Sequence, residues 1–158
     1  MIDYVEILIA DFNDMADILE LQKLAFASEG ALYHDSDIEP LTQTLDSIHE
    51  DFKNYIFLKA VYNNTIVGSV KIGNTSEYCW VGRLMVNPGF QNKGIGRKLM
   101  IAAEQQYPDA KQYLLYTGYK SLKNIKLYES LGYIKSGDYC NDRNPELKLI
   151  KMVKRNMY

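Results

Sequence analysis

The fold of this chain is decided by the run Val86-Asn87-Pro88-Gly89-Phe90-Gln91-Asn92-Lys93-Gly94-Ile95-Gly96. A strand-like segment ends at Val86, a turn follows at residues 87–89, and an amphipathic helix opens at Gly94. The start of a helix leaves several backbone N–H groups without partners, and the helix dipole favours negative charge there. Because Gly94 and Gly96 have no side chain, a ligand can approach the backbone closely. The junction therefore predicts a cradle for phosphate oxygens.

The residues around these glycines exclude two familiar phosphate-binding motifs. Lys93 and Arg97 add positive charge to the junction. A dinucleotide-binding fingerprint needs a third glycine where this chain has Leu99. A P-loop needs Lys and then Ser or Thr after its last glycine, where this chain has Ile95 and Gly96. The glycines could also serve only the turn or close helix packing, and the loop sequence leaves that alternative open.

The composition is that of an ordinary globular protein. The chain has 158 residues, of which 47% are hydrophobic and 24% charged, so we expect a single domain over residues 1–158 with a full hydrophobic core. Its net charge is −2, from 18 Lys and Arg against 20 Asp and Glu. Nucleic-acid binding proteins usually carry a basic face, so we expect no nucleic acid as a partner.

The chain shows no signal of a membrane protein or of a disulfide scaffold. No apolar run reaches the roughly 20 residues that a membrane span needs, and the first residues lack the basic start and apolar core of a signal peptide. Two cysteines, Cys79 and Cys140, cannot build a disulfide framework or a metal site by themselves. We therefore expect reduced thiols, no metal, no membrane partner and a cytoplasmic location, although a single disulfide stays open.

The hydrophobic pattern predicts an α+β domain whose mixed sheet is covered by helices. Strands are expected at residues 4–10, 55–62, 65–72, 77–86, 112–117, 133–139 and 147–154. Helices are expected at residues 14–28, 41–52, 94–107 and 122–131. The pair Asn63-Asn64 tolerates positive φ and should close a hairpin between the second and third strands.

The helix ends and faces are predicted from local chemistry. Asn13 or Asp14 should cap the first helix, Ser121 should cap the last one, and Gly132 should end it. The buried face of the first helix is expected to hold Ile18, Leu21, Leu24 and Ala25. The stretch of residues 28–40 is polar and is expected to be a loop.

The helix at residues 122–131 contains a polar residue in its apolar stripe. Leu127, Leu131, Tyr128 and Ile125 share one face, and Asn124 lies near its middle, one turn before Tyr128. A buried amide needs hydrogen-bond partners. The partner could be a neighbouring loop carbonyl, with Tyr128 as a packed ring, or it could be a ligand.

Both features together resemble the GNAT superfamily of acyl-CoA-dependent N-acetyltransferases. Gln91-Asn92-Lys93-Gly94-Ile95-Gly96 resembles the family's Gln/Arg-x-x-Gly-x-Gly/Ala signature. The run from Asn124 to Tyr133 resembles its Asn-x-x-x-Tyr helix with a Leu-Gly-Phe/Tyr ending. The resemblance covers nearly the whole chain. It implies about seven strands in a mixed sheet, about four helices, and fourth and fifth strands that splay apart around the pantetheine arm of acetyl-CoA.

The resemblance also implies roles for individual residues. Backbone groups of Leu84, Met85 and Val86 would bind the pantetheine, and Asn124 would bind the same arm. Tyr128 would contact the co-substrate as the general acid that protonates the departing thiolate. A backbone N–H near Val86 could stabilise the oxyanion. The pyrophosphate would be held, mainly by backbone N–H groups, at Gln91, Asn92, Lys93, Gly94, Ile95, Gly96 and Arg97.

The implied reaction is direct attack of a primary amine on the thioester in a ternary complex, so no cysteine nucleophile is needed. Several relatives carry a Glu where this chain has Trp80, so no general base is assigned. Trp80 could instead wall the acceptor pocket or pack in the core.

The acceptor is expected to bind at residues 29–37 and 139–144. The acidic residues there, Glu29, Asp35, Asp37 and Asp142, would suit a cationic amine such as a polyamine, an aminoglycoside or a Lys side chain, or they are solvated loop charges. His34 is expected to be a loop residue.

Two other functions stay open at this point. One is a non-catalytic CoA-binding or sensory domain of the same fold, and the other is a binder of a different phosphate ligand. The acceptor, whether small molecule or peptide, the acyl chain length and the choice between monomer and homodimer are not fixed by the sequence.

Overall fold

The computed structural model describes residues 4–140 and 143–156, and its strands form one open sheet. The strands are β1 (Glu6–Ile9), β2 (Ile56–Tyr62), β3 (Thr65–Asn74), β4 (Cys79–Val86), β5 (Gln112–Gly118), β6 (Ile134–Cys140) and β7 (Lys148–Arg155). Their order across the sheet is β1-β2-β3-β4-β5-β7-β6, and every neighbouring pair is antiparallel except β4 with β5. The predicted mixed sheet of seven strands is confirmed.

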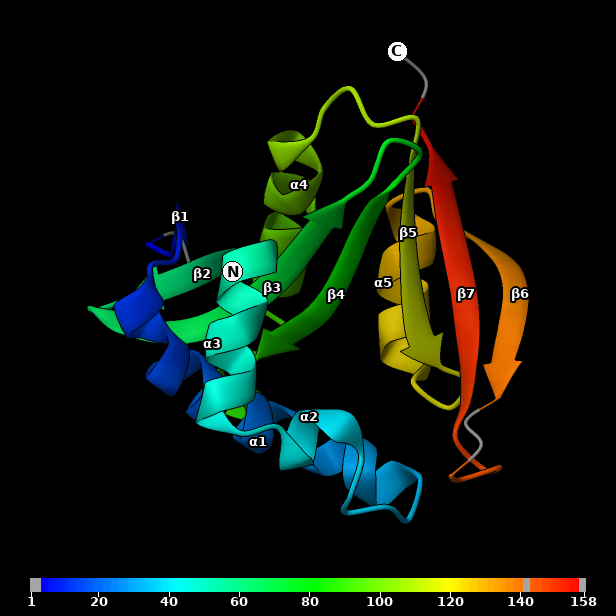
Figure 1. Ribbon diagram of the computed structural model, residues 1–158, viewed down its shortest axis with the longest axis horizontal. Coiled ribbons are helices and arrows are strands. Elements are labelled where there is room, and N and C mark those ends of the chain that lie inside the picture. The colour runs from blue at the N-terminus through cyan, green and yellow to red at the C-terminus, as the bar shows by residue number, and fades with distance from the viewer. Residues whose placement is uncertain (1–3, 141–142, 157–158) are drawn as a thin grey trace.

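Helices cover both faces of the sheet (Figure 1). The helices are η1 (Phe12–Asp14), α1 (Met15–Leu32), α2 (Glu39–Thr42), α3 (Leu45–Asn54), η2 (Pro88–Phe90), α4 (Ile95–Gln106) and α5 (Leu122–Ser130). Successive side chains of a strand point to opposite faces. Accordingly Leu58 on β2 joins the core beneath α4, and its neighbour Phe57 joins the core beneath α1 and α3.

The fourth and fifth strands diverge, as the sequence resemblance implied. Only two residue pairs join them, Cys79 with Tyr113 and Trp80 with Leu114, and both lie where the strands begin. Beyond these pairs β4 and β5 separate to opposite sides of a wedge (Figure 1). Residues 81–86 of β4 therefore have no strand partner on the side that faces β5.

The predicted turns are confirmed. Asn63 and Asn64 have φ of 49° and 61° and close the hairpin between β2 and β3. Gly132 has φ of 99° directly after α5, where an L side chain would be strained.

The helices of the N-terminal region differ from the prediction in length and number. α1 continues to Leu32, four residues beyond the predicted end, because Glu29, Ala31 and Leu32 are good helix formers and the Gly30 carbonyl accepts from the Asp35 N–H at 2.8 Å. The predicted second helix is divided into α2 and α3, since Thr44 caps a new helix by accepting a hydrogen bond from the Ser47 backbone N–H at 3.2 Å. The described residues thus form five α-helices where about four were expected.

The prediction of the buried face of α1 is confirmed for Ile18 and Leu21 and was wrong for Leu24. Leu24 is 53% exposed, whereas Gln22 is buried. The buried positions Met15, Ile18, Leu19 and Gln22 follow the spacing of one helical face, which Leu24 does not share. Gln22 is accepted in the core because its Nε2 donates to the Pro40 carbonyl at 3.0 Å and to Gln43 Oε1 at 2.8 Å.

The predicted caps of α1 and α5 were wrong in detail. Asp11 caps η1, and the Asp14 carboxylate accepts from the Asp11 N–H at 2.8 Å instead of capping α1. Ser121 precedes α5 but makes no capping bond, because its hydroxyl donates to Glu29 Oε2 at 2.6 Å.

Candidate active site

The loop before α4 turns the chain through two left-handed residues. Asn92 has φ of 62° and Gly94 has φ of 83°. The turn before them is fixed by Asn87, whose Oδ1 accepts from the Gly89 N–H at 2.9 Å. In the part of the chain that the structure describes, no acceptor meets the N–H groups of Ile95, Gly96 and Arg97. These donors at a helix N-terminus form the geometry that binds anionic oxygens.

A first cavity of about 610 Å³ lies between β4, the N-terminal ends of α4 and α5, and the last turns of α1. Its lining includes ten of the residues that the sequence assigned to the co-substrate, namely Leu84, Met85, Val86, Gln91, Asn92, Gly94, Ile95, Gly96, Arg97 and Asn124. Two assigned residues, Lys93 and Tyr128, do not line it. The cavity thus combines the free edge of β4 with the free N–H groups of α4.

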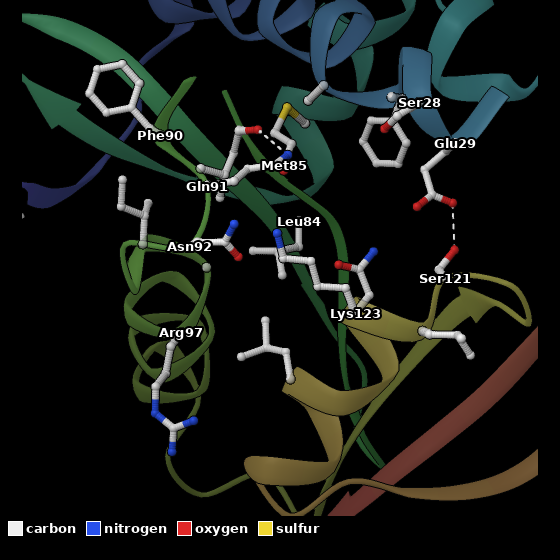
Figure 2. Close-up of a pocket in the computed structure, with 18 of the residues that line it drawn as sticks. Ser28, Glu29, Leu84, Met85, Phe90, Gln91, Asn92, Arg97, Ser121 and Lys123 are labelled. Atoms are coloured by element: carbon white, nitrogen blue, oxygen red, sulfur yellow. Dashed lines mark hydrogen bonds between the residues drawn. The ribbon is translucent and has the colours of Figure 1, made fainter. Parts of the chain in front are cut away.

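The charges of this cavity differ from those expected. Figure 2 shows the Arg97 side chain directed away from the other labelled residues of the cavity. Its Nη1 donates to Ser130 Oγ at 2.9 Å and so connects α4 to α5. Lys120 and Lys123 line the cavity from the start of α5 and were not predicted as site residues. The helical pattern placed Lys123 opposite the apolar stripe, and it gave no sign that the stripe ends at a cavity.

A second cavity of about 500 Å³ lies on the other side of α1, between β4 and β5. Aromatic rings dominate its wall, from Phe26, Tyr33, Trp80, Tyr116, Tyr128 and Tyr139. The second cavity therefore opens on the predicted acceptor region, of which it uses Glu29, Tyr33 and Tyr139.

The two cavities share four lining residues, Phe26, Glu29, Leu84 and Asn124. Asn124 is half-buried, and no hydrogen bond joins its amide to any residue described. Glu29 is the one ionisable side chain of the four, and its carboxylate accepts from Ser121 across the gap between α1 and α5 (Figure 2). A reaction between two ligands would take place at this border.

Tyr128 lies on the second cavity, adjacent to the border. Its side chain is buried, and its hydroxyl has no hydrogen-bond partner among the described residues. Burial raises the pKa of Tyr128 well above its usual value, and the negative charge of Glu29 raises it further. The phenol is therefore protonated at neutral pH and holds a proton that it can donate.

Trp80 walls the second cavity, which was one of the two roles expected for it. Its indole lies over Gly82, where any Cβ would overlap the ring, and its ring centroid is 5.6 Å from that of Tyr55. Trp80 offers no proton acceptor at the position where several relatives carry a Glu.

The cysteines take no part in the site. Cys79 is buried in the core, and burial raises the pKa of its thiol to about 12. Cys140 is exposed and unbonded.

Of the acidic residues expected at the acceptor site, Glu29 borders both cavities, whereas Asp35 and Asp37 line neither. Asp35 accepts hydrogen bonds from the guanidinium of Arg143 and from Asn144 Nδ2, and these bonds lower the pKa of its carboxyl to about 2. His34 occupies a turn with φ of 51° and lines neither cavity. Asp142 lies outside the described residues.

The described residues contain neither a group of metal-binding side chains nor a membrane-spanning helix. Within residues 4–140 and 143–156, no three His, Cys, Asp or Glu side chains gather in a way that could hold a metal ion. Over the same ranges, no helix has the length and apolar character needed to cross a membrane.

Comparison with known proteins gives a family and a fold. The family model described as the acetyltransferase (GNAT) family matches residues 15–133. A search of curated protein sequences found no match.

Several solved structures superpose on almost the whole chain. The ribosomal-protein-S18-alanine N-acetyltransferase from Escherichia coli has a TM-score of 0.79 at 15% identity, covering 98% of this chain and 95% of its own. The PaiA N-acetyltransferase from Thermoplasma acidophilum, in complex with coenzyme A, has a TM-score of 0.78 at 18% identity, covering 96% and 98%. YncA from Salmonella typhimurium, with its cofactor acetyl-CoA, has a TM-score of 0.78 at 20% identity, covering 99% and 96%. At these identities the likeness shows the fold.

Proposed function

Because the chain belongs to the GNAT acetyltransferase family, we propose that it transfers an acetyl group from acetyl-CoA to the primary amine of a small molecule or peptide. The observation that carries this proposal is the border between the two cavities. There the free edge of β4, Asn124 and Glu29 meet beside the unpaired hydroxyl of Tyr128. One cavity can hold the acetyl donor and the other the amine, with the reacting atoms at the border.

The first cavity fits acetyl-CoA by shape and by donor set. The N–H groups of Ile95, Gly96 and Arg97 would hold the pyrophosphate, with Lys120 and Lys123 adding positive charge. A Cβ on Gly96 would lie 3.4 Å from Leu127, so any larger side chain would fill the cradle. Two similar structures contain coenzyme A or acetyl-CoA, which supports the same donor for this chain.

The edge of β4 would bind the pantetheine arm. At Leu84, Met85 and Val86 no strand pairs β4 on the side facing β5, so the backbone groups that point to that side can bind an amide-containing ligand as they would bind a strand. Asn124 would supply the hydrogen bond of its amide to the same arm, since no described residue takes that bond.

Tyr128 would act as the general acid. When an amine nitrogen attacks the thioester carbon and the carbon–sulfur bond breaks, the sulfur leaves as a thiolate that needs a proton. Burial raises the pKa of Tyr128, so its hydroxyl stays protonated at neutral pH and can donate a hydrogen bond to the sulfur while the carbon–sulfur bond breaks, passing its proton on as negative charge builds up there.

Glu29 would take the proton that the attacking amine loses. It is the carboxylate that borders both cavities, and Trp80 offers no proton acceptor of its own in the second one. Its bond to Ser121 orients one oxygen and leaves the other for the amine. Glu29→Gln should therefore reduce turnover with little change in acetyl-CoA affinity, measured by thiol release and by calorimetry.

The proposal is tested first by ligand binding. A ligand that binds only the folded state raises the melting temperature by mass action. We expect acetyl-CoA and CoA to raise it, and ATP and NAD to leave it unchanged. A larger shift with ATP or NAD would overturn the proposal, whereas a shift with CoA but no thiol release from any amine would favour a non-catalytic CoA-binding domain.

The role of Tyr128 is tested by Tyr128→Phe. The ring is retained and the proton is lost, so acetyl-CoA binding should persist while turnover falls roughly 100-fold or more. Unchanged turnover in this variant would contradict the assignment.

A further inference from the structure

The wall of the second cavity contains one cation in the part of the chain that the structure describes, the guanidinium of Arg83. Its side chain is only 16% exposed, and its Nε is fully buried with no hydrogen-bond partner among the described residues. Its Nη2 lies 3.1 Å from Oε1 of Glu39, a side chain that is 82% exposed. The Arg83 guanidinium thus has five N–H donors, and its ion-pair partner, Glu39, is largely in contact with water.

The backbone of β4 is distorted at Arg83. Ser69 on β3 pairs with Met85, and Lys71 pairs with Gly82, so β4 carries one extra residue between these pairs. Arg83 takes up the extra residue with φ of 52°, a conformation that costs free energy for any residue other than glycine. A bulge of this kind changes the direction of a side chain, and here the residue in the bulge is Arg83, which lines the second cavity.

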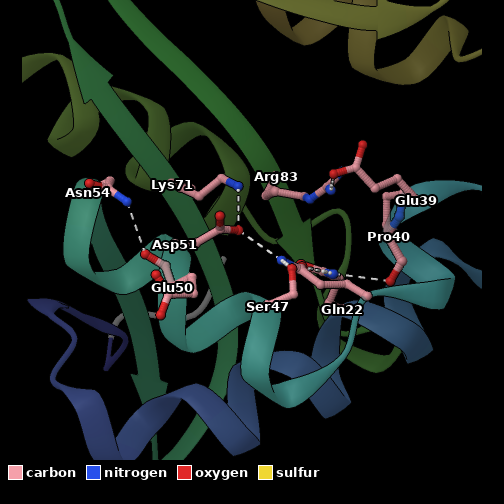
Figure 3. Close-up of polar contacts among 10 residues, drawn as sticks. Gln22, Glu39, Pro40, Ser47, Glu50, Asp51, Asn54, Lys71 and Arg83 are labelled. Atoms are coloured by element: carbon pink, nitrogen blue, oxygen red, sulfur yellow. Dashed lines mark hydrogen bonds and ion pairs between the residues drawn. The ribbon is translucent and has the colours of Figure 1, made fainter.

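The nearby acidic group that could neutralise Arg83 is already engaged. Asp51 Oδ2 accepts from Lys71 Nζ at 3.0 Å and from Gln43 Nε2 at 2.8 Å (Figure 3). Figure 3 also shows Arg83 directed away from this network, toward Glu39 on α2. Burial lowers the pKa of Arg83, the largest effect on it, while Glu39 and Asp51 oppose the change. The guanidinium is therefore under-compensated for its burial.

The remaining wall fits a small apolar body with a polar group at each end. Tyr33, Trp80, Tyr116 and Tyr139 present aromatic rings, and Glu29 stands at the border where the acetyl group would arrive. Of the acids expected to attract a polycation, Asp35 is bound by Arg143, and neither Asp35 nor Asp37 lines this cavity. The charged groups of the second cavity are Arg83 on β4, its exposed partner Glu39, and Glu29 at the border.

From these contacts we propose that the acceptor is an amino acid, a small molecule with both an amine and a carboxylate on an apolar body. Arg83 binds the carboxylate through its terminal Nη1 and Nη2 groups, in place of the solvated Glu39 carboxylate, because its Nε is fully buried. The amine then points to the border, toward Glu29 and Tyr128. This proposal rests on the acetyltransferase function and narrows it to one class of acceptor.

The test compares matched acceptors that differ only in the carboxylate. Leucine, phenylalanine, 5-aminopentanoate and 4-(aminomethyl)benzoate are each paired with the corresponding amide and with the decarboxylated amine, and spermidine is added as a polycation. Thiol release at saturating acetyl-CoA gives kcat/KM, and calorimetry in the presence of CoA gives acceptor binding. We expect at least one amino acid to exceed its amide and its amine about 10- to 100-fold, the range for a lost hydrogen bond to a charged group.

Arg83→Gln then assigns the preference to this residue. It should remove the discrimination between carboxylate and amide, through KM more than kcat, and leave CoA affinity unchanged. Arg155→Gln is the matched control, because Arg155 is exposed on β7 and lines neither cavity. Arg83→Gln should fold, since it removes a buried charge whose partner is solvated.

The outcomes distinguish failure of the amino-acid acceptor proposal from failure of the acetyltransferase function on which it rests. Binding of CoA together with a preference for amides, decarboxylated amines or spermidine would overturn the amino-acid assignment and leave the acetyltransferase intact. So would a wild-type protein that neither binds nor acetylates any amino carboxylate, or an Arg83→Gln variant with full discrimination. Failure to bind CoA at all would instead overturn the acetyltransferase function.

Discussion

Gly118 is the last residue of β5, and a single methyl group added there should weaken the contact between the end of α1 and the start of α5. The Tyr33 ring lies against Gly118, and a Cβ there would overlap the Tyr33 hydroxyl, lie 2.6 Å from its Cζ and lie 2.9 Å from Ser121 Oγ. Tyr33 is buried, and its hydroxyl accepts from the Lys120 N–H at 2.9 Å and lies 3.2 Å from Ser121 Oγ. These contacts fasten the end of α1 to the start of α5.

Gly118→Ala should therefore destabilise the protein by about 3 kcal/mol. Displacing Tyr33 forfeits about two hydrogen bonds at about 1 kcal/mol each and adds an overpacking cost of about 1 kcal/mol, the low end for one added methyl group. For a chain of this size, 1 kcal/mol corresponds to about 2–4 °C in melting temperature, so thermal denaturation should show a decrease of about 6–12 °C.

The physical cause is isolated by a double-mutant cycle. Tyr33→Phe removes the hydroxyl that overlaps the new methyl group, so Gly118→Ala should cost less in the Tyr33→Phe background than in the wild type. Gly137→Ala on β6 is the control, because a Cβ there meets nothing within 4 Å. A melting temperature for Gly118→Ala within about 1 °C of the wild type, or strictly additive effects in the cycle, would refute the reasoning.

Three further predictions concern the cradle, the acid stability and the thiols. Gly94→Glu should abolish CoA binding, measured by calorimetry, since it places a carboxylate at the helix N-terminus and strains a residue with φ of 83°; CoA affinity equal to the wild type would contradict the cradle. Asp35 has a folded pKa of about 2, below its usual value of about 3.8, so its stabilising effect is complete above about pH 4 and is lost as pH falls toward 2. Asp35→Asn should flatten the pH dependence of unfolding in that window, and an unaltered pH profile would argue against the pairing with Arg143. Ellman's reagent should modify one thiol per native chain, Cys140, because Cys79 is buried with a pKa of about 12; two fast-reacting thiols would show that Cys79 is accessible.

The parts of the fold that the sequence predicted well are those decided by neighbours in the chain. The Asn63-Asn64 pair closes the hairpin that its tolerance of positive φ predicted, and a helix begins directly after Gly94, where the sequence placed its start. Strand positions followed from apolar runs bounded by turn residues, and the GNAT family match agrees with the motif resemblance. Each of these signals lies within a few residues of the structure that it specifies.

The parts that could not be predicted depend on contacts between distant segments. Gln22 was not among the residues expected on the buried face of α1. Its burial is made favourable by hydrogen bonds to the Pro40 carbonyl and to Gln43. Ser121 was expected to cap a helix, but its hydroxyl donates a hydrogen bond to Glu29, 92 positions earlier in the chain. Periodicity describes one element at a time, so it gives no information on such partners.

Arg83 illustrates a different limit. A positive φ at glycine or asparagine has a sequence signature, but at arginine it does not, so the bulge in β4 could not be foreseen. The position of Lys123 at the first cavity was missed for a different reason, because a charged side chain on a helix surface is usually solvated.

The splay of β4 from β5 divides the sheet into two blocks, β1 to β4 and β5 with β7 and β6, that share only two backbone pairs. The hydrogen-bond ladder that makes a sheet cooperative is therefore interrupted at its centre. In the free protein the two blocks can open as separate units, and their amide hydrogens need not exchange at one common rate. A ligand whose amide groups occupy the gap would act as a missing strand and restore continuity across the sheet. Co-substrate binding in this fold would then be, in thermodynamic terms, the last step of folding.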